Sequence, residues 1–194
     1  MIFQNGVLFF NYGAGKTEVN KSSSIDSFPS EVCAYETLGF TPEDCTATEY
    51  QIHKKLGEGY PVMEAIFDEG KKSVEVKRIP FADFNKKYNR ERDICAKTKG
   101  CKFNPGFSPG RKYWGWARMI QKAVLKITPE VLTFYPNIKI HYIAVIVPDN
   151  MSIKDKKIII KNTLREVDNV CKSGKVPFKI KIEVVFIEGT DEMF

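Results

Sequence analysis

The sequence contains few of the residues that build zinc sites or hydrolytic triads. It has two histidines and five cysteines in 194 residues, and none of the cysteines forms a CxxC pair. Structural zinc needs about four ligands at characteristic spacings, so it is disfavoured. His53 and His141 have no credible Ser or Cys partner in the sequence, and we expect satisfied or surface histidines rather than catalytic ones. For the cysteines we expect buried or loop thiols in a reducing compartment.

Long apolar runs are also missing. No stretch reaches the roughly 18 to 20 apolar residues of a membrane-spanning helix. Residues 1–13 lack the basic start and the cleavage site of a signal peptide. We therefore expect an intracellular protein (cytoplasmic, or nuclear or viral in a eukaryotic host) that is not secreted and has no membrane partner. A hydrophobic content of 43% fits a single globular domain, residues 1–194.

Positive charge is concentrated in the middle of the chain. Between Lys71 and Lys126, 16 Lys or Arg residues stand against four acids; this net +12 leaves −6 for the remainder of a chain whose total is +6. Such asymmetry usually presents the basic part to a polyanion. We expect nucleic acid as the partner, DNA rather than RNA, and the alternative is a solvated lysine-rich surface. The basic residues expected to contact nucleic acid are Lys71, Lys72, Arg78, Arg111, Lys112, Arg118 and Lys122.

Apolar periodicity and turn signals predict an α/β fold. The sequence Thr41-Pro42-Glu43-Asp44 is typical of a helix start, and this helix is expected to run to Leu56. Residues 60–67 and 73–79 flank a turn at 68–71, which predicts an antiparallel hairpin. Further helices are expected at 30–38, 111–127 and 153–171, and further strands at 7–10, 138–147 and 178–187. A strand, helix and strand in succession imply a parallel crossover, so the predicted sheet is mixed, with flanking helices.

The hairpin carries the residues that could perform chemistry. Side chains two apart on a strand share a face, so Glu75 and Lys77 point the same way. A tight turn without a bulge pairs Phe67 with Lys72 and places Glu64 opposite Glu75. Facing carboxylates normally cost stability, and a divalent cation between them would reverse the sign of the interaction. A bulge would shift this register by one residue, and the simpler alternative is that Glu75 and Lys77 only face water.

A third acid is suggested by helical spacing. The positions i, i+4, i+7 and i+11 are Cys45, Glu49, Ile52 and Leu56. Glu49 interrupts an otherwise apolar stripe, and a partly buried carboxylate there would need a metal or a lysine as partner. The alternative is a Glu at the edge of the stripe that reaches water.

These residues suit phosphodiester cleavage. Two or three carboxylates can hold Mg²⁺ or Mn²⁺ through oxygen ligands and leave positions for water and phosphate. A neighbouring Lys77 could orient or deprotonate the attacking water and neutralise charge on the phosphate oxygens.

The segment ATEYQIHKKLGEGYPVMEAIFDEGKKSVEVKR, residues 47–78, resembles the PD-(D/E)xK nuclease superfamily, and its local pattern is most similar to archaeal Holliday-junction resolvases and restriction-endonuclease-like proteins. The resemblance implies a restriction-endonuclease-like mixed sheet and a bound Mg²⁺ or Mn²⁺. It assigns Glu49 to the helix acid and Glu75 and Lys77 to the ExK pair. Glu64 matches the first-strand acid best. The family's Pro-Asp is absent before that strand, which leaves Asp68 as a competing metal ligand.

The sequence thus predicts a metal-dependent endonuclease or exonuclease that hydrolyses phosphodiester bonds, with DNA favoured over RNA as the expected substrate and the choice between them left open. The long segment 80–110 is expected to help grip the backbone, and a homodimer is a further hypothesis because small nucleases often cut two strands as dimers. One alternative is a non-catalytic nucleic-acid-binding protein with a basic face. Another is a protein-interaction domain of viral or mobile-element origin.

Overall fold

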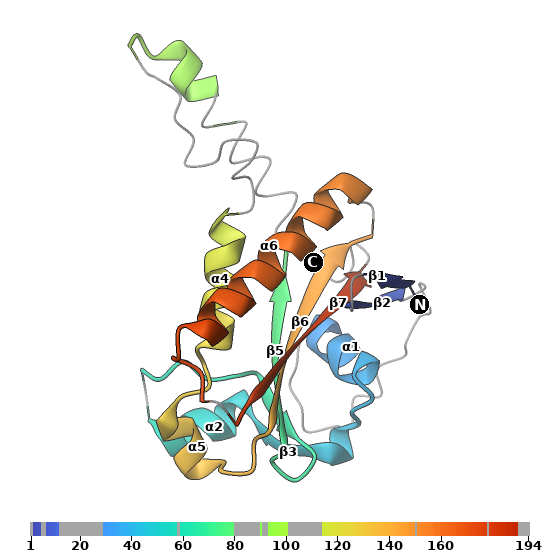
Figure 1. The fold of residues 1–194 in the computed structure, drawn as a ribbon, viewed down its shortest axis with the longest axis vertical. Coiled ribbons are helices and arrows are strands. Elements are labelled where there is room, and N and C mark those ends of the chain that lie inside the picture. Colours follow the sequence, from blue (N-terminus) through green and yellow to red (C-terminus); the bar gives the residue numbers. More distant parts are fainter. Residues whose placement is uncertain are drawn as a thin grey trace.

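The computed structural model describes residues 2–4, 7–11, 29–57, 59–79, 90, 93–100, 114–149, 151–177 and 179–189 (Figure 1). At residues 2–4, 7–11, 29–30 and 114–118 it describes the backbone but not the side chains. Within the described part of the chain, no helix is both long and apolar enough to cross a bilayer.

A seven-stranded mixed sheet forms the centre of the fold. Its strands are β1 Ile2–Gln4, β2 Val7–Asn11, β3 Cys45–Thr48, β4 Ala65–Phe67, β5 Lys72–Arg78, β6 Ile140–Pro148 and β7 Lys181–Gly189, arranged in the order β1-β2-β7-β6-β5-β4-β3. The four central strands β2, β7, β6 and β5 pair in parallel, and the outer strands β1, β4 and β3 pair antiparallel with their neighbours. This arrangement confirms the predicted mixed α/β sheet and its antiparallel hairpin, β4–β5.

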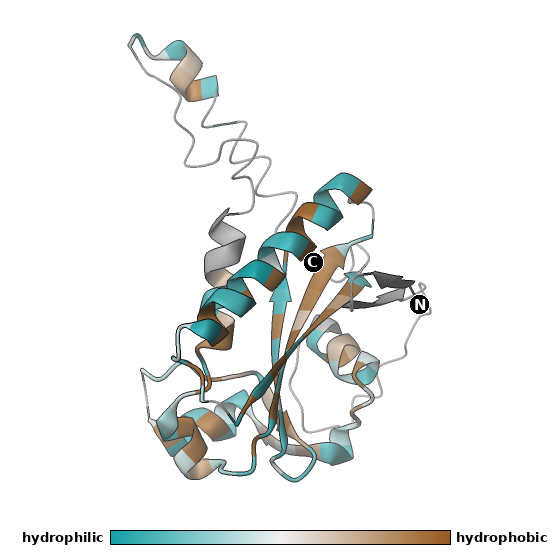
Figure 2. Ribbon diagram, in the orientation of Figure 1, coloured by the Kyte–Doolittle hydropathy of each residue, from teal (hydrophilic) through white to brown (hydrophobic). Residues whose placement is uncertain are grey.

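Helices cover both faces of the sheet (Figure 1). They are α1 Pro29–Thr37, α2 Glu49–Leu56, α4 Trp114–Val124, α5 Pro129–Phe134 and α6 Ile153–Lys172. Alternation along β6 separates two cores: Ile143 and Val145 pack in the cluster that includes α4 and α6 residues, whereas Ala144 and Ile146 pack in the cluster that includes α1 residues. Figure 2 shows the apolar colouring of β6 beside the mixed colouring of α6. The prediction that residues 138–147 form a strand covered on both faces is confirmed.

The predicted helix from Pro42 to Leu56 is wrong in its first half. Pro42–Asp44 form a single 3-10 turn, Cys45–Thr48 form β3, and α2 begins only at Glu49. Strand β3 pairs with β4 and buries Ala47, so tertiary pairing outweighs the local capping signal at Thr41. A second capping signal lies at Thr48, directly before α2. The Thr48 amide donates a hydrogen bond to the Gln51 side chain at 3.0 Å.

The cysteines follow the expectation in part. Cys33, Cys45 and Cys171 are free thiols. Cys95 is disulfide-bonded, so the expectation of a thiol is wrong at this position. Sequence spacing could not reveal which sulfur atoms approach within bonding distance, because that depends on the path of the chain in space.

Candidate active site

The β4–β5 hairpin has the register that a tight turn predicts. Phe67 pairs with Lys72 and Ala65 pairs with Val74. Strand β4 begins at Ala65 and is shorter than β5, so it provides no backbone partner for the amide of Val76. The Glu64 carboxylate accepts a hydrogen bond from this amide at 3.1 Å. Glu64 is thereby held against the middle of β5, beside Glu75.

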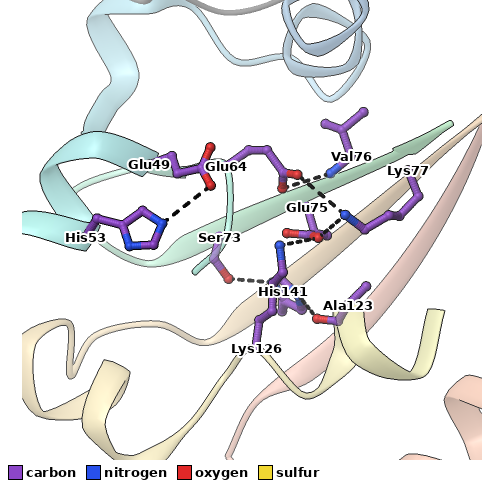
Figure 3. Close-up of polar contacts among 10 residues, drawn as sticks. All are labelled: Glu49, His53, Glu64, Ser73, Glu75, Val76, Lys77, Ala123, Lys126 and His141. Atoms are coloured by element: carbon purple, nitrogen blue, oxygen red, sulfur yellow. Dashed lines mark hydrogen bonds and ion pairs between the residues drawn. The ribbon is translucent and has the colours of Figure 1, made fainter. Parts of the chain in front are cut away.

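Four charged side chains meet at this point, and we call them the carboxylate–ammonium cluster: Glu64, Glu75, Lys77 and Lys126 (Figure 3). Glu75 is fully buried. Its Oε1 pairs with the Nζ of Lys77 and lies 2.5 Å from the Nζ of Lys126. The Nζ of Lys77 is also 3.7 Å from Glu64 Oε1. The side chains of Glu64, Lys77 and Lys126 retain 14%, 19% and 17% of their exposure, so the cluster has limited access to solvent.

The two carboxylates of the cluster are close enough to share a proton. Burial, together with the adjacent Glu75, raises the pKa of Glu64 to about 9. Burial also opposes ionisation of Glu75, but the hydrogen bond from Glu64 and the charges of Lys126 and Lys77 outweigh it and lower the pKa of Glu75. At neutral pH the pair therefore carries one proton, held by Glu64, and Glu75 is the anion.

Lys77 remains an ammonium ion in this environment. Burial alone lowers the pKa of Lys77, but the charges of Glu75 and Glu64 and their hydrogen bonds raise it above its ordinary value. The net effect disfavours a neutral amine.

A neutral hydrogen-bond chain lies beneath the cluster. His141 is fully buried, and its ring nitrogens contact Ser73 Oγ at 2.8 Å and the carbonyl oxygen of Ala123 at 3.1 Å (Figure 3). Because a carbonyl only accepts, Nε2 carries the hydrogen and Nδ1 accepts from the Ser73 hydroxyl. Burial lowers the pKa of His141 to about 4, so the ring is neutral. The expectation of a satisfied histidine is confirmed for His141, and the chain ties β5 and β6 to the end of α4.

The other two acids proposed from the sequence lie elsewhere. Glu49 is the first residue of α2; its side chain is 57% exposed and pairs with His53 Nε2 at 3.7 Å. The prediction that Glu49 lies partly buried on an apolar helical stripe is therefore wrong, because the residues before Glu49 form a strand rather than a helical turn. Asp68 lies in the hairpin turn and pairs with Lys71 and Lys72. Glu75 is three residues beyond the partner of Phe67, about 10 Å along the strand, so the geometry favours Glu64 over Asp68 as the companion of Glu75.

The basic residues proposed to contact nucleic acid are in different environments. Lys71 and Lys72 are engaged by acids of the turn, and the Nζ of Lys72 also lies 5.5 Å from the centre of the Phe40 ring. Lys122 is exposed on α4, and Arg78 is half-buried at the end of β5. Arg111 and Lys112 lie outside the described residues, as does the side chain of Arg118.

Sequence reasoning missed the role of Lys126. In the sequence Lys126 is one lysine of the basic segment 71–126, and a lysine just after a helix is ordinarily explained by the helix dipole. Its only distinguishing signal was its place between the buried residues Val124 and Ile127, which brings its backbone close to the core.

The cluster can be tested as a donor set for Mg²⁺ or Mn²⁺. Among the described residues, no three His, Cys, Asp or Glu side chains are grouped so as to hold a metal ion. Two carboxylates are nevertheless a common Mg²⁺ donor set when water and substrate phosphate complete the coordination. Both oxygens of Glu75 are buried, and the groups that face this carboxylate are Glu64 and the ammonium groups of Lys77 and Lys126. Glu64 and Glu75 therefore fit such an ion as a minimal pair.

The charge balance differs from the one expected from the sequence. Facing carboxylates were expected to need a divalent cation, but two ammonium groups already offset their charge. The metal is consequently not required to explain how Glu64 and Glu75 can be neighbours.

Comparisons with known proteins provide no evidence about the function of this site. No protein-family model matches the sequence, and no curated protein matches it. A solved structure of the CdiA-CT/CdiI toxin and immunity complex from Yersinia pseudotuberculosis is similar over 73% of this chain and 98% of that chain, with 13% identity and a TM-score of 0.31. A similarity of this size carries no inference about fold or function.

Proposed function

We propose that the protein is a metal-dependent nuclease that hydrolyses phosphodiester bonds in DNA. The observation that carries this proposal is the meeting of Glu64, Glu75 and Lys77 at the end of strand β4. These are the acid and the ExK pair that the resemblance to PD-(D/E)xK nucleases assigns. The order of elements, a hairpin followed by a helix and a strand parallel to β5, is also the order that this resemblance implies.

Each residue has a distinct role in this proposal. Glu64 and Glu75 would hold Mg²⁺ or Mn²⁺, and such an ion supplies a Lewis acid for the phosphate oxygens. Loading requires Glu64 to give up its proton, since a metal ligand is the carboxylate form. Lys77 would orient the attacking water and offset charge that develops on the phosphate. Its raised pKa favours this electrostatic role over that of a general base.

The proposal is tested by cleavage assays with plasmid DNA, single-stranded DNA and RNA in Mg²⁺, Mn²⁺ or EDTA. We expect cleavage with either metal, none with EDTA, and a loss of about 100-fold or more in Glu75→Gln and in Lys77→Met. Glu69→Gln is the matched control, because Glu69 lies on the same hairpin with a side chain that is 85% exposed. Activity that survives in EDTA or in Glu75→Gln would overturn the proposal.

The second candidate is a non-catalytic nucleic-acid-binding protein. The two lysines favour this candidate, because they balance the charge of the carboxylates without a metal ion and the cluster can then serve a purely structural role. It predicts salt-sensitive binding that is indifferent to EDTA and to Glu75→Gln. The same set of variants therefore separates the two candidates.

A further inference from the structure

Two ammonium groups converge on a single carboxylate oxygen in the cluster. Lys77 and Lys126 both pair with Oε1 of the fully buried Glu75. Lys77 reaches it from the same face of the same strand, two residues away. Lys126 comes from a different element, the short turn that follows α4. Two like charges this close repel one another, so the second ammonium must be held by its attraction to Glu75.

The Nζ of Lys126 lies near the position that a metal ion bound to Glu75 would occupy. It lies 2.5 Å from Glu75 Oε1, within half an ångström of the about 2.0 to 2.1 Å at which Mg²⁺ binds carboxylate oxygens. A metal ion on this side of Oε1 and the Lys126 ammonium would occupy the same space and would also repel one another. The metal ion and the Lys126 ammonium group therefore cannot both contact this side of Glu75 Oε1 at the same time.

Lys126 can leave this position without rearrangement of the fold. The backbone of Lys77 is part of the sheet, where β5 pairs with β6 through this residue. The backbone before Lys126 is anchored separately, since the Ala123 carbonyl accepts from His141 at 3.1 Å and from the Lys126 amide at 3.4 Å. Only the flexible side chain of Lys126, which is 17% exposed, has to swing toward solvent.

We infer that Lys126 is a placeholder for the divalent cation: its ammonium group occupies the cation position on Glu75 in the metal-free protein and withdraws when the metal binds. This inference rests on the proposed function, because it assigns Glu64 and Glu75 as the metal ligands. It adds that metal affinity is limited by competition from a residue of this chain. When no metal is bound, the Lys126 ammonium group offsets the negative charge of the buried Glu75 carboxylate.

The test is a Mn²⁺ titration followed by electron paramagnetic resonance and calorimetry at one fixed pH, without nucleic acid. Removing the competing charge in Lys126→Met should tighten Mn²⁺ binding by about tenfold or more relative to the wild type. Lys126→Arg keeps the charge and should bind Mn²⁺ much as the wild type does. Lys161→Met, an exposed lysine on α6, is the control for a general change of one charge. If Lys126→Met does not fold, Lys126→Gln, which keeps a hydrogen-bond donor, is titrated in its place.

The outcomes separate this inference from the proposed function. Tighter Mn²⁺ binding in Lys126→Met than in both Lys126→Arg and Lys161→Met supports the placeholder. Unchanged or weaker binding in Lys126→Met, with a wild type that still cleaves DNA in Mn²⁺, overturns the placeholder and leaves the nuclease proposal standing. Absence of Mn²⁺ binding in every variant, together with absence of cleavage, overturns both.

Discussion

Glu75 is a carboxylate without exposed surface, and its surroundings determine its charge. Burial of an ionised carboxylate is costly unless nearby groups compensate it. In this protein, Lys77, Lys126 and the proton shared with Glu64 provide that compensation. Because the other lysine still pairs with Glu75, loss of one lysine should destabilise the fold by less than the roughly 3 to 5 kcal/mol that an unpaired buried charge costs. Stability must therefore be measured in parallel with activity for every variant of the cluster.

Glu64 gives the first test at the scale of a single residue. Its pKa of about 9 in the folded state lies above the ordinary value of 4.5. Between these pH values the unfolded chain loses a proton that the folded chain keeps, so stability falls as the pH rises. Glu64→Gln keeps an acceptor for the Val76 amide and removes this effect. Its stability relative to the wild type should increase between pH 5 and pH 8.5.

Urea denaturation at the two pH values checks this prediction, with Glu43→Gln as an exposed control. An equal difference between Glu64→Gln and the wild type at pH 5 and pH 8.5 would contradict the raised pKa.

His141 gives a second test, with the opposite dependence on pH. Its pKa of about 4 in the folded state lies below the ordinary 6.5, so the unfolded chain takes up a proton first and stability falls as the pH drops through this window. His141→Gln removes this contribution. Its loss of stability relative to the wild type should be smaller at pH 5 than at pH 7, by about 2 kcal/mol. Thermal unfolding at both pH values measures the difference, and a pH-independent difference would show that His141 titrates normally.

The hairpin turn is the element that fixes the register of the cluster. Asp68 and Glu69 both have positive φ angles, 54° and 52°, and Gly70 follows at 85°. This conformation favours Gly, Asn or Asp, so Glu69 is strained. Glu69→Asn should stabilise the protein by about 0.5 to 1 kcal/mol without changing activity. Chemical denaturation measures the gain; a loss of stability would indicate that the weak Lys71–Glu69 pair matters more than the backbone conformation.

The same element shows what the sequence could predict. The turn residues and the alternation along 73–79 were sufficient for the Phe67–Lys72 register, because hairpin geometry is local. The start of α2 was placed too early, because the pairing of β3 with β4 depends on contacts about twenty residues apart. Strand β1 and helix α5 are three and six residues long and give no clear periodic signal.

For the site, the sequence predicted Glu64, Glu75 and Lys77 as neighbours, and the structure brings them together. It did not predict Lys126, which arrives from a segment about fifty residues away. The packing of α4 on the sheet determines that approach, and no local pattern encodes it. The excess of positive charge was visible in the sequence, but the placement of one lysine against a buried acid was not.

At the scale of the whole molecule, the charge asymmetry predicts binding that depends strongly on salt. If the basic segment meets a nucleic-acid backbone, each phosphate contact contributes about one unit to the slope of log affinity against log salt. Lys122 is exposed on α4 and is a proposed contact. Lys122→Gln should reduce this slope by about one, whereas Lys161→Gln on α6 should leave it unchanged. Fluorescence anisotropy over a salt series measures both, and equal slopes would remove Lys122 from the binding surface.

The proposed function requires that Glu64 and Glu75 together hold a divalent cation. Crystals of the wild type and of Glu75→Gln soaked in Mn²⁺ test it most directly, through anomalous diffraction at the manganese edge. We expect an anomalous peak in contact with both carboxylates in the wild type and its loss in Glu75→Gln. A wild-type crystal at saturating Mn²⁺ that shows no peak there, with Lys77 and Lys126 still paired with Glu75, would contradict it.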